Sequence, residues 1–118
     1  MKIEDQILAF AEAQWGKRTD EQIALKACGE CGEFAEAVTK MGERRTSPED
    51  ADLEVGDVLI VLSQWAAKRG TTLEELRAVA FNRIKARVEE NYHYKPFSEW
   101  DFGTTAQAVE RLDHQPQP

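Results

Sequence analysis

Four carboxylates stand in two short motifs whose spacing matches the turn of an α-helix. The first motif, GECGE, carries Glu30 and Glu33, and the second, EVGD, carries Glu54 and Asp57. Residues three apart project from the same face of a helix, so each pair should point one way. If the two helices are antiparallel neighbours, which a short connection favours, all four carboxylates converge. The pattern therefore predicts an all-oxygen cation site.

The donor set of this candidate site favours a hard divalent cation. No histidine or thiolate shares the face, and oxygen ligands are typical of Mg²⁺ or Mn²⁺ rather than of zinc or copper. Mg²⁺ held by a few carboxylates usually completes its coordination with water and substrate phosphate, so it can recruit a polyphosphate to an acidic protein. A di-iron centre would need Glu-x-x-His pairs, which these motifs lack. We therefore expect Mg²⁺, with Mn²⁺ as the alternative ion.

Acidic pairs on a helix are more often a solvated surface, and this chain has 22 acidic residues. Two features argue against that interpretation. Asp57 precedes VLIVL (residues 58–62), which is apolar on every side of a helix, so we expect burial there and a partner or metal for Asp57. Gly29, Gly32 and Gly56 each cost a helix about 1 kcal/mol relative to alanine, and they would let two backbones approach or leave room for a ligand. Clustered carboxylates should also raise the pKa of at least one member.

Hydrophobic periodicity and capping signals predict four helices and no strands, which is an all-α bundle. Capping-box patterns at Thr19 and Thr72 begin the second and fourth helices, and Ser47 before Pro48 begins the third. The expected helices span residues 2–15, 20–41, 48–68 and 73–90.

The chain of 118 residues is expected to form one helical domain, residues 1–91, followed by a C-terminal arm and tail, residues 92–118. Aromatic residues concentrate in residues 92–102, and a short helix is expected near residues 105–112. The aromatic arm and a helix that is apolar all round carry more apolar surface than four short helices readily cover. We therefore expect a homodimer, or a tetramer built from dimers, with the site near the subunit interface.

A net charge of -7 argues against binding to nucleic acid polymers or to anionic membranes. The N-terminal residues have no apolar signal core, and no apolar run approaches membrane-spanning length, so a cytoplasmic protein is expected. Cys28 and Cys31 form a C-x-x-C without a second such pair or a nearby histidine. We expect both thiols to be small buried hydrophobes rather than zinc ligands or a redox pair.

The two acidic motifs, separated by twenty residues, resemble the signature of the MazG-like all-α nucleoside triphosphate pyrophosphatases. That signature is commonly written E-E-x-x-E, a spacer and E-x-x-D, continuing into an apolar run. The resemblance spans roughly residues 3–91. Gly29 stands where many members have the first glutamate, which is like the G-E-x-G-E variant of the dCTP pyrophosphatase branch. By that match the metal ligands would be Glu30, Glu33, Glu54 and Asp57.

The resemblance implies Mg²⁺-dependent hydrolysis of a (deoxy)nucleoside triphosphate to the monophosphate and pyrophosphate. Glu33, if not fully engaged by metal, would be the catalytic base. The segment N-R-I-K resembles the family's N-x-x-K, so Asn82 and Lys85 would contact the nucleotide. Trp15 resembles an aromatic residue that lies against the base in dCTP-specific relatives. Lys40 stands near the position of their second tryptophan, so the resemblance does not specify cytosine.

Two alternatives use the same acids differently. A non-catalytic helical interaction module would carry them as a solvated or Ca²⁺-binding patch, although the glycines beside the acids count against it. A phosphoribosyl-ATP pyrophosphatase would use similar acids for another substrate. The base, the sugar and the pathway are not specified by the residues.

Overall fold

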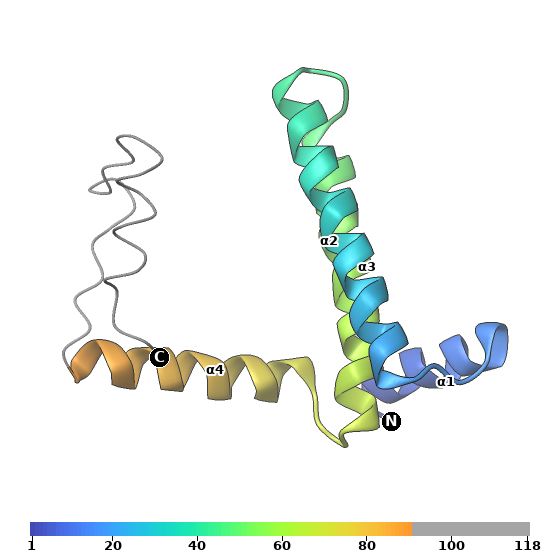
Figure 1. The fold of residues 1–118 in the computed structure, drawn as a ribbon, viewed down its shortest axis with the longest axis vertical. Coiled ribbons are helices and arrows are strands. Elements are labelled where there is room, and N and C mark those ends of the chain that lie inside the picture. The colour runs from blue at the N-terminus through green and yellow to red at the C-terminus, as the bar shows by residue number, and fades with distance from the viewer. Residues whose placement is uncertain (91–118) are drawn as a thin grey trace. The chain divides into compact units, whose positions relative to one another are not determined.

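The computed structural model describes residues 1–90, whose regular structure is entirely helical (Figure 1). Its elements are α1 (Ile3–Trp15), α2 (Asp20–Gly42), α3 (Pro48–Lys68) and α4 (Leu73–Glu89). No strand occurs within residues 1–90, and no helix there is long and apolar enough to span a bilayer. The prediction of an all-α chain with four helices is confirmed. The expected arm at residues 92–118 and the short helix near residues 105–112 lie outside the described residues.

α2 and α3 begin at the capping signals that the sequence carries. The hydroxyl of Thr19 accepts the N–H of Gln22 at 3.1 Å, and the Gln22 side chain accepts the N–H of Thr19 at 2.9 Å. Ser47 accepts the N–H of Asp50 at 3.4 Å, and Pro48 occupies the first turn of α3. These contacts satisfy N–H groups that have no partner within the helix. The predicted starts of α2 and α3 are confirmed.

The start of α4 is held by a residue from α1. The hydroxyl of Thr72 accepts the N–H of Glu75 at 3.1 Å, as the capping pattern predicts. In addition, Glu4 is buried, and its Oε2 accepts the N–H of Leu73 at 3.1 Å. A carboxylate at a helix N-terminus satisfies a free N–H and interacts favourably with the helix dipole. Glu4 therefore links two helices that are far apart in the sequence.

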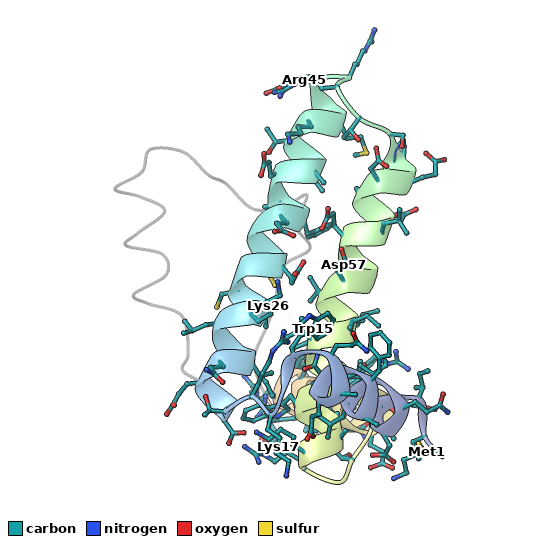
Figure 2. The ribbon with its side chains drawn as sticks, turned by 90° about the vertical axis from the view of Figure 1, so that its right-hand side faces the viewer. Met1, Trp15, Lys17, Lys26, Arg45 and Asp57 are labelled. Carbon is teal, nitrogen blue, oxygen red and sulfur yellow. The ribbon has the colours of Figure 1, made fainter. Side chains whose placement is uncertain are left out.

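α2 and α3 form a hairpin joined by a short turn, and α1 packs against α3 (Figure 1). At the open end of the hairpin, the ammonium of Lys68 contacts a carboxylate oxygen of Asp20 at 2.9 Å and donates to the carbonyl of Arg18 at 2.9 Å. Figure 2 shows Arg45 at the turn, at the opposite end of the hairpin from Lys17. The turn and these polar contacts hold the two long helices side by side.

The chain divides into two compact units, Met1–Arg77 and Ala78–Pro118. The first unit contains α1, α2, α3 and the first residues of α4. The core of this unit is made mostly of short side chains. Its buried apolar residues are Ala11, Ile23, Ala37, Ala51, Val61 and Ala66.

The expectation that residues 58–62 are buried on every side is wrong for the described chain. Val61 is 4 % exposed, but Leu59 and Ile60 are each 47 % exposed. α1 and α2 cover only part of the circumference of α3, so the remaining sides of the apolar run face outward. The fold therefore leaves large apolar side chains uncovered beside a small core.

The link between Glu4 and α4 generates a stability prediction. Glu4→Ala should lower the free energy of unfolding by about 1–3 kcal/mol, because it removes a charged acceptor from a partly buried helix start. Asp5→Ala is the matched control, since Asp5 is exposed in the same first turn of α1. Urea denaturation of the three proteins measures the difference. Equal losses in both variants would show that the effect comes from the charge on α1 and not from the contact with Leu73.

Candidate functional site

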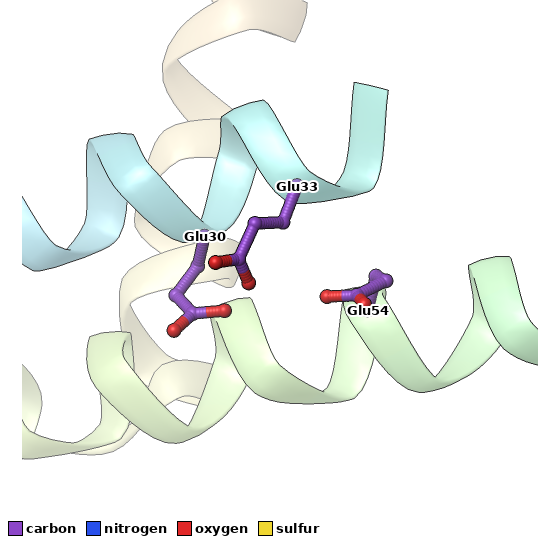
Figure 3. Close-up of side chains that lie close together, drawn as sticks. All are labelled: Glu30, Glu33 and Glu54. Atoms are coloured by element: carbon purple, nitrogen blue, oxygen red, sulfur yellow. The ribbon is translucent and has the colours of Figure 1, made fainter. Parts of the chain in front are cut away.

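Three glutamates from two helices converge between the arms of the hairpin, where Glu30 is buried, Glu54 is half-buried and Glu33 is exposed. Glu30 and Glu33 extend from α2 towards α3, and Glu54 extends from α3 towards them (Figure 3). One carboxylate oxygen from each residue lies within 4.8 Å of those of the other two. Glu30 and Glu33 share a helix face because they are three residues apart, and the hairpin brings Glu54 opposite that face. The predicted convergence is therefore observed for three of the four acids.

Asp57, the fourth acid, lies one turn further along α3 (Figure 2). It is exposed and is not among the three converging carboxylates, but it lines the same cavity as Glu33 and Glu54. The expectation that Asp57 itself is buried is wrong: Leu53 and Ile60 on its side of α3 are also exposed, although Val61, one turn along, is buried. Asp57 is thus placed beside the site without the burial that would force it to find a partner.

Glu30 is the most buried member of the group, with 9 % of its surface exposed. Its Oε1 lies 3.0 Å from the ammonium of Lys26, one turn earlier on α2. The hydrogen bond from Lys26 lowers the pKa of Glu30 below its ordinary value. Sequence reasoning missed Lys26, although a lysine and a glutamate four residues apart on a helix are expected to pair. Lys26 therefore keeps a buried carboxylate ionised.

Glu33 has the opposite electrostatic environment. Its pKa is raised, first by its hydrogen bond with Glu30, then by the charge of Glu30, by desolvation and by the charge of Glu54. The expectation that clustering raises the pKa of at least one carboxylate is confirmed. Because Glu30 and Glu33 interact directly, they titrate as a pair, in which the pKa of Glu33 is raised and that of Glu30 is lowered.

Glu54 contributes an oxygen without a hydrogen-bonding partner. Its Oε2 is buried and makes no hydrogen bond to any described residue. A buried carboxylate oxygen without a partner is unfavourable, and a cation beside it would remove that cost. All the converging donor atoms are carboxylate oxygens, which are the ligands that Mg²⁺ and Mn²⁺ prefer. The residues present therefore fit a hard divalent cation.

Glu33 and Glu54 line a cavity of about 670 Å³ whose lining is mostly acidic, whereas Glu30 does not line it. The lining residues are Glu33, Glu36, Ala37, Lys40, Thr46, Asp50, Leu53, Glu54 and Asp57. Lys40, the one basic residue among them, contacts Glu36 Oε1 at 2.9 Å, and this hydrogen bond lowers the pKa of Glu36. Glu36 is exposed, as expected for a solvated acid. The remaining carboxylates give the cavity an excess of negative charge.

The glycines beside the acids are not explained by close backbone approach within the described chain. A Cβ atom added at Gly29, Gly32 or Gly56 would meet no heavy atom within 4 Å beyond its immediate surroundings. The sequence suggests two explanations for these glycines, namely close approach of two backbones and open space beside the acids. The structure agrees with the second explanation.

Trp15 does not line the cavity beside the carboxylates. Trp15 is exposed at the end of α1, where its ring meets Phe10 edge-on at 6.1 Å and lies 5.3 Å from the guanidinium of Arg18. Asn82 and Lys85 lie on α4 within the second unit. Their roles in nucleotide binding stay predictions.

Cys28 and Cys31 are exposed, so the expectation that they are buried hydrophobes is wrong. The inward face of α2 is occupied instead by Ile23, Glu30 and Ala37. The cysteines fall on the outer side of the same helix, because they are offset from those positions around its axis.

No family model, curated protein or solved structure matches the chain. The resemblance to the MazG-like enzymes therefore depends on the two acidic motifs and their spacing. Their placement in the hairpin is an independent observation.

The raised pKa of Glu33 generates a pH prediction for the metal-free protein. The pKa of Glu33 is higher in the folded state than in the unfolded state, so between these two values the folded state binds more protons than the unfolded state. The free energy of unfolding therefore falls as pH rises through this interval, and it stays lower at higher pH. Glu33→Gln should therefore raise the melting temperature at pH 7 in excess chelator. The gain should vanish at about pH 3, well below the ordinary pKa of glutamate, where Glu33 is protonated in both states. Melting curves at the two pH values measure it.

Glu36→Gln is the matched control on the same helix. Because Lys40 lowers the pKa of Glu36, this variant should lose a little stability at pH 7 and none in acid. A lower melting temperature for Glu33→Gln at pH 7 would contradict the proposed repulsion.

Proposed function

We propose that the chain is a Mg²⁺-dependent nucleotide pyrophosphohydrolase, which cleaves a (deoxy)nucleoside triphosphate to the monophosphate and pyrophosphate. The observation that carries the proposal is the convergence of Glu30, Glu33 and Glu54 from two helices, beside a cavity that Asp57 also lines. These four acids are also the residues that resemble the MazG-like signature. The cavity volume lies within the range of about 300–1,000 Å³ that is usual for small-molecule sites.

Glu30, Glu33 and Glu54 would hold the cation, and Asp57 would be the fourth ligand from the cavity wall. The buried, unpartnered Oε2 of Glu54 supports this assignment. Mn²⁺ is the second candidate, because it prefers the same oxygen ligands. When bound, the ion supplies neutralisation of phosphate charge and a lower pKa for the attacking water. The excess of acids in the cavity also favours a phosphate ligand that arrives with a cation rather than alone.

The chain's own residues have distinct proposed roles. Glu33 accepts the proton of the water that attacks the α-phosphorus, and the bond from that phosphorus to the bridging oxygen breaks to release pyrophosphate. Lys26 holds Glu30 ionised, so the proton goes to Glu33. Lys85 and Asn82 are proposed to contact the phosphates, and Trp15 is proposed to contact the base.

A non-catalytic interaction module with a solvated or Ca²⁺-binding patch is the second candidate. The exposure of Asp57 favours it, because an exposed acid needs neither a metal nor a partner. The buried oxygen of Glu54 and the charge repulsion at Glu33 favour the enzyme.

The enzymatic proposal is tested by assaying a panel of nucleoside triphosphates and phosphoribosyl-ATP with Mg²⁺, with Mn²⁺ and with excess chelator. We expect pyrophosphate as the first product and no turnover in chelator. Glu54→Gln and Asp57→Asn should each lower turnover by on the order of 100-fold or more. Loss of a residue that hydrogen-bonds to a metal ligand typically costs about 10- to 100-fold, and loss of the ligand itself should cost more. Asp52→Asn is the control on α3, because Asp52 is exposed and does not line the cavity.

Melting curves of the same variants separate a metal ligand from a structural residue. Asp57→Asn should melt at the parent's temperature or higher without metal, and it should lose most of the stabilisation that Mg²⁺ gives the parent. Orthophosphate as the first product, turnover in chelator, or a lower metal-free melting temperature for Asp57→Asn would each contradict the proposal.

We also propose that the chain forms a homodimer or a tetramer built from dimers. Leu53 and Ile60 share one side of α3 and leave apolar surface uncovered there, and Leu59 leaves more on an adjacent side. Exposed large apolar side chains that gather on one element are typical of an interface. Ile60→Glu should shift the assembly towards monomer, whereas Leu25→Glu, at an exposed position on α2, should not. Light scattering at micromolar concentration measures the mass. A monomeric parent protein would refute the assembly.

A further inference from the structure

Cys28 and Cys31 place two exposed thiols three residues apart on α2. At this spacing helix geometry puts the Cα atoms about 5 Å apart, which lies within the usual disulfide range of about 4.4–6.8 Å. Helical side chains lean towards the N-terminus, so Cys31 leans towards Cys28. Neither thiol has a role in the carboxylate site, and exposure makes both accessible to small reagents.

We propose that Cys28 and Cys31 are a reversible thiol–disulfide pair whose oxidation closes a ring that contains Glu30. Side chains three apart on a helix have Cβ atoms about 5–6 Å apart, whereas a disulfide needs about 3.5–4.5 Å, so the ring must contract locally by roughly 1–2 Å. Gly29 lies inside the ring and Gly32 directly follows it. A Cβ atom at either position would meet no heavy atom within 4 Å outside its own stretch of helix, so no neighbouring element restrains the backbone there, and glycine tolerates the altered dihedral angles.

The oxidation is a two-step exchange with a small-molecule disulfide such as oxidised glutathione. One cysteine sulfur attacks the glutathione disulfide, forms a mixed disulfide and releases one glutathione thiol. The second cysteine attacks the protein sulfur of that mixed disulfide, forms the bond between Cys28 and Cys31 and releases the second glutathione thiol. Two protein thiols are oxidised and one glutathione disulfide is reduced, and a dithiol reagent reverses the exchange.

Closure of the ring should disturb the carboxylate site, because Glu30 is one of the two residues between the cysteines. Its side chain is buried against the hairpin and paired with Lys26 at 3.0 Å, so contraction of its backbone shifts a carboxylate that has little room. The consequence for Mg²⁺ binding depends on the function proposed above. The formation of the disulfide does not.

The disulfide is tested in the full chain with oxidised and reduced glutathione at a series of ratios, followed by alkylation and intact-mass measurement. We expect the two thiols to be lost together, a mass lower by two hydrogen atoms per chain, and recovery with dithiothreitol. Cys28→Ser and Cys31→Ser should each stop at the glutathione adduct. A persistent adduct on the parent, thiols that stay free in excess oxidant, or a disulfide between two chains would overturn the proposal.

The coupling to Glu30 is tested by Mg²⁺-induced thermal shifts of the reduced and oxidised protein. The Mg²⁺ concentration that gives half of the maximal thermal shift should rise by about 10- to 100-fold after oxidation. This is the range seen when residues that orient a metal ligand are lost. The double variant Cys28→Ser/Cys31→Ser should respond like the reduced parent in both buffers. An equal response of both parent forms would overturn the coupling. A reduced parent without any Mg²⁺ response would overturn the proposed metal site, while the mass measurement would still decide the disulfide.

Discussion

The structure depends on how the α2–α3 hairpin accommodates acids on its inward face, where a helix pair ordinarily places apolar side chains. Each glutamate meets this constraint in a different way. Glu30 is paired with Lys26, Glu33 holds a proton to higher pH, and Glu54 keeps one buried oxygen without a partner. An ionised carboxylate that lacks such compensation in a partly buried place is unfavourable. The hairpin therefore gives up some stability where its charges meet.

The same constraint shapes the packing around the site. Charged groups take positions in the middle of the hairpin that apolar residues would otherwise fill, so the core is small and rich in alanine. Compensation comes from the ends of the elements, through the capping box at Thr19, the contacts of Asp20 with Lys68, and the acceptance of the Leu73 N–H by Glu4. Large apolar side chains are instead exposed on every described helix, and α3 exposes Leu53, Val55, Leu59, Ile60 and Leu62.

Local signals made the helices predictable, because caps, proline and glycine act within one turn of the chain. The convergence of Glu30, Glu33 and Glu54 was also predictable, since it follows from helix spacing and a short turn. The burial of the cysteines and of residues 58–62 was predicted wrongly. The apolar residues of α2 and α3 are distributed over more than one side of each helix. Their pattern therefore does not determine which side packs against the neighbouring helix. That choice is made by the packing of whole elements.

The turn at residues 43–47 decides which acids face each other. Glu33 lies nine positions before the end of α2 at Gly42, and Glu54 lies six positions after the start of α3 at Pro48. One residue inserted in either stretch would rotate an acid by about 100° around its helix and move it by about 1.5 Å, out of alignment with the opposite arm. Extra residues in the turn itself would leave both arms paired at a small entropic cost. Homologous chains that keep this arrangement can therefore differ in length at the turn, but not between the turn and the acids.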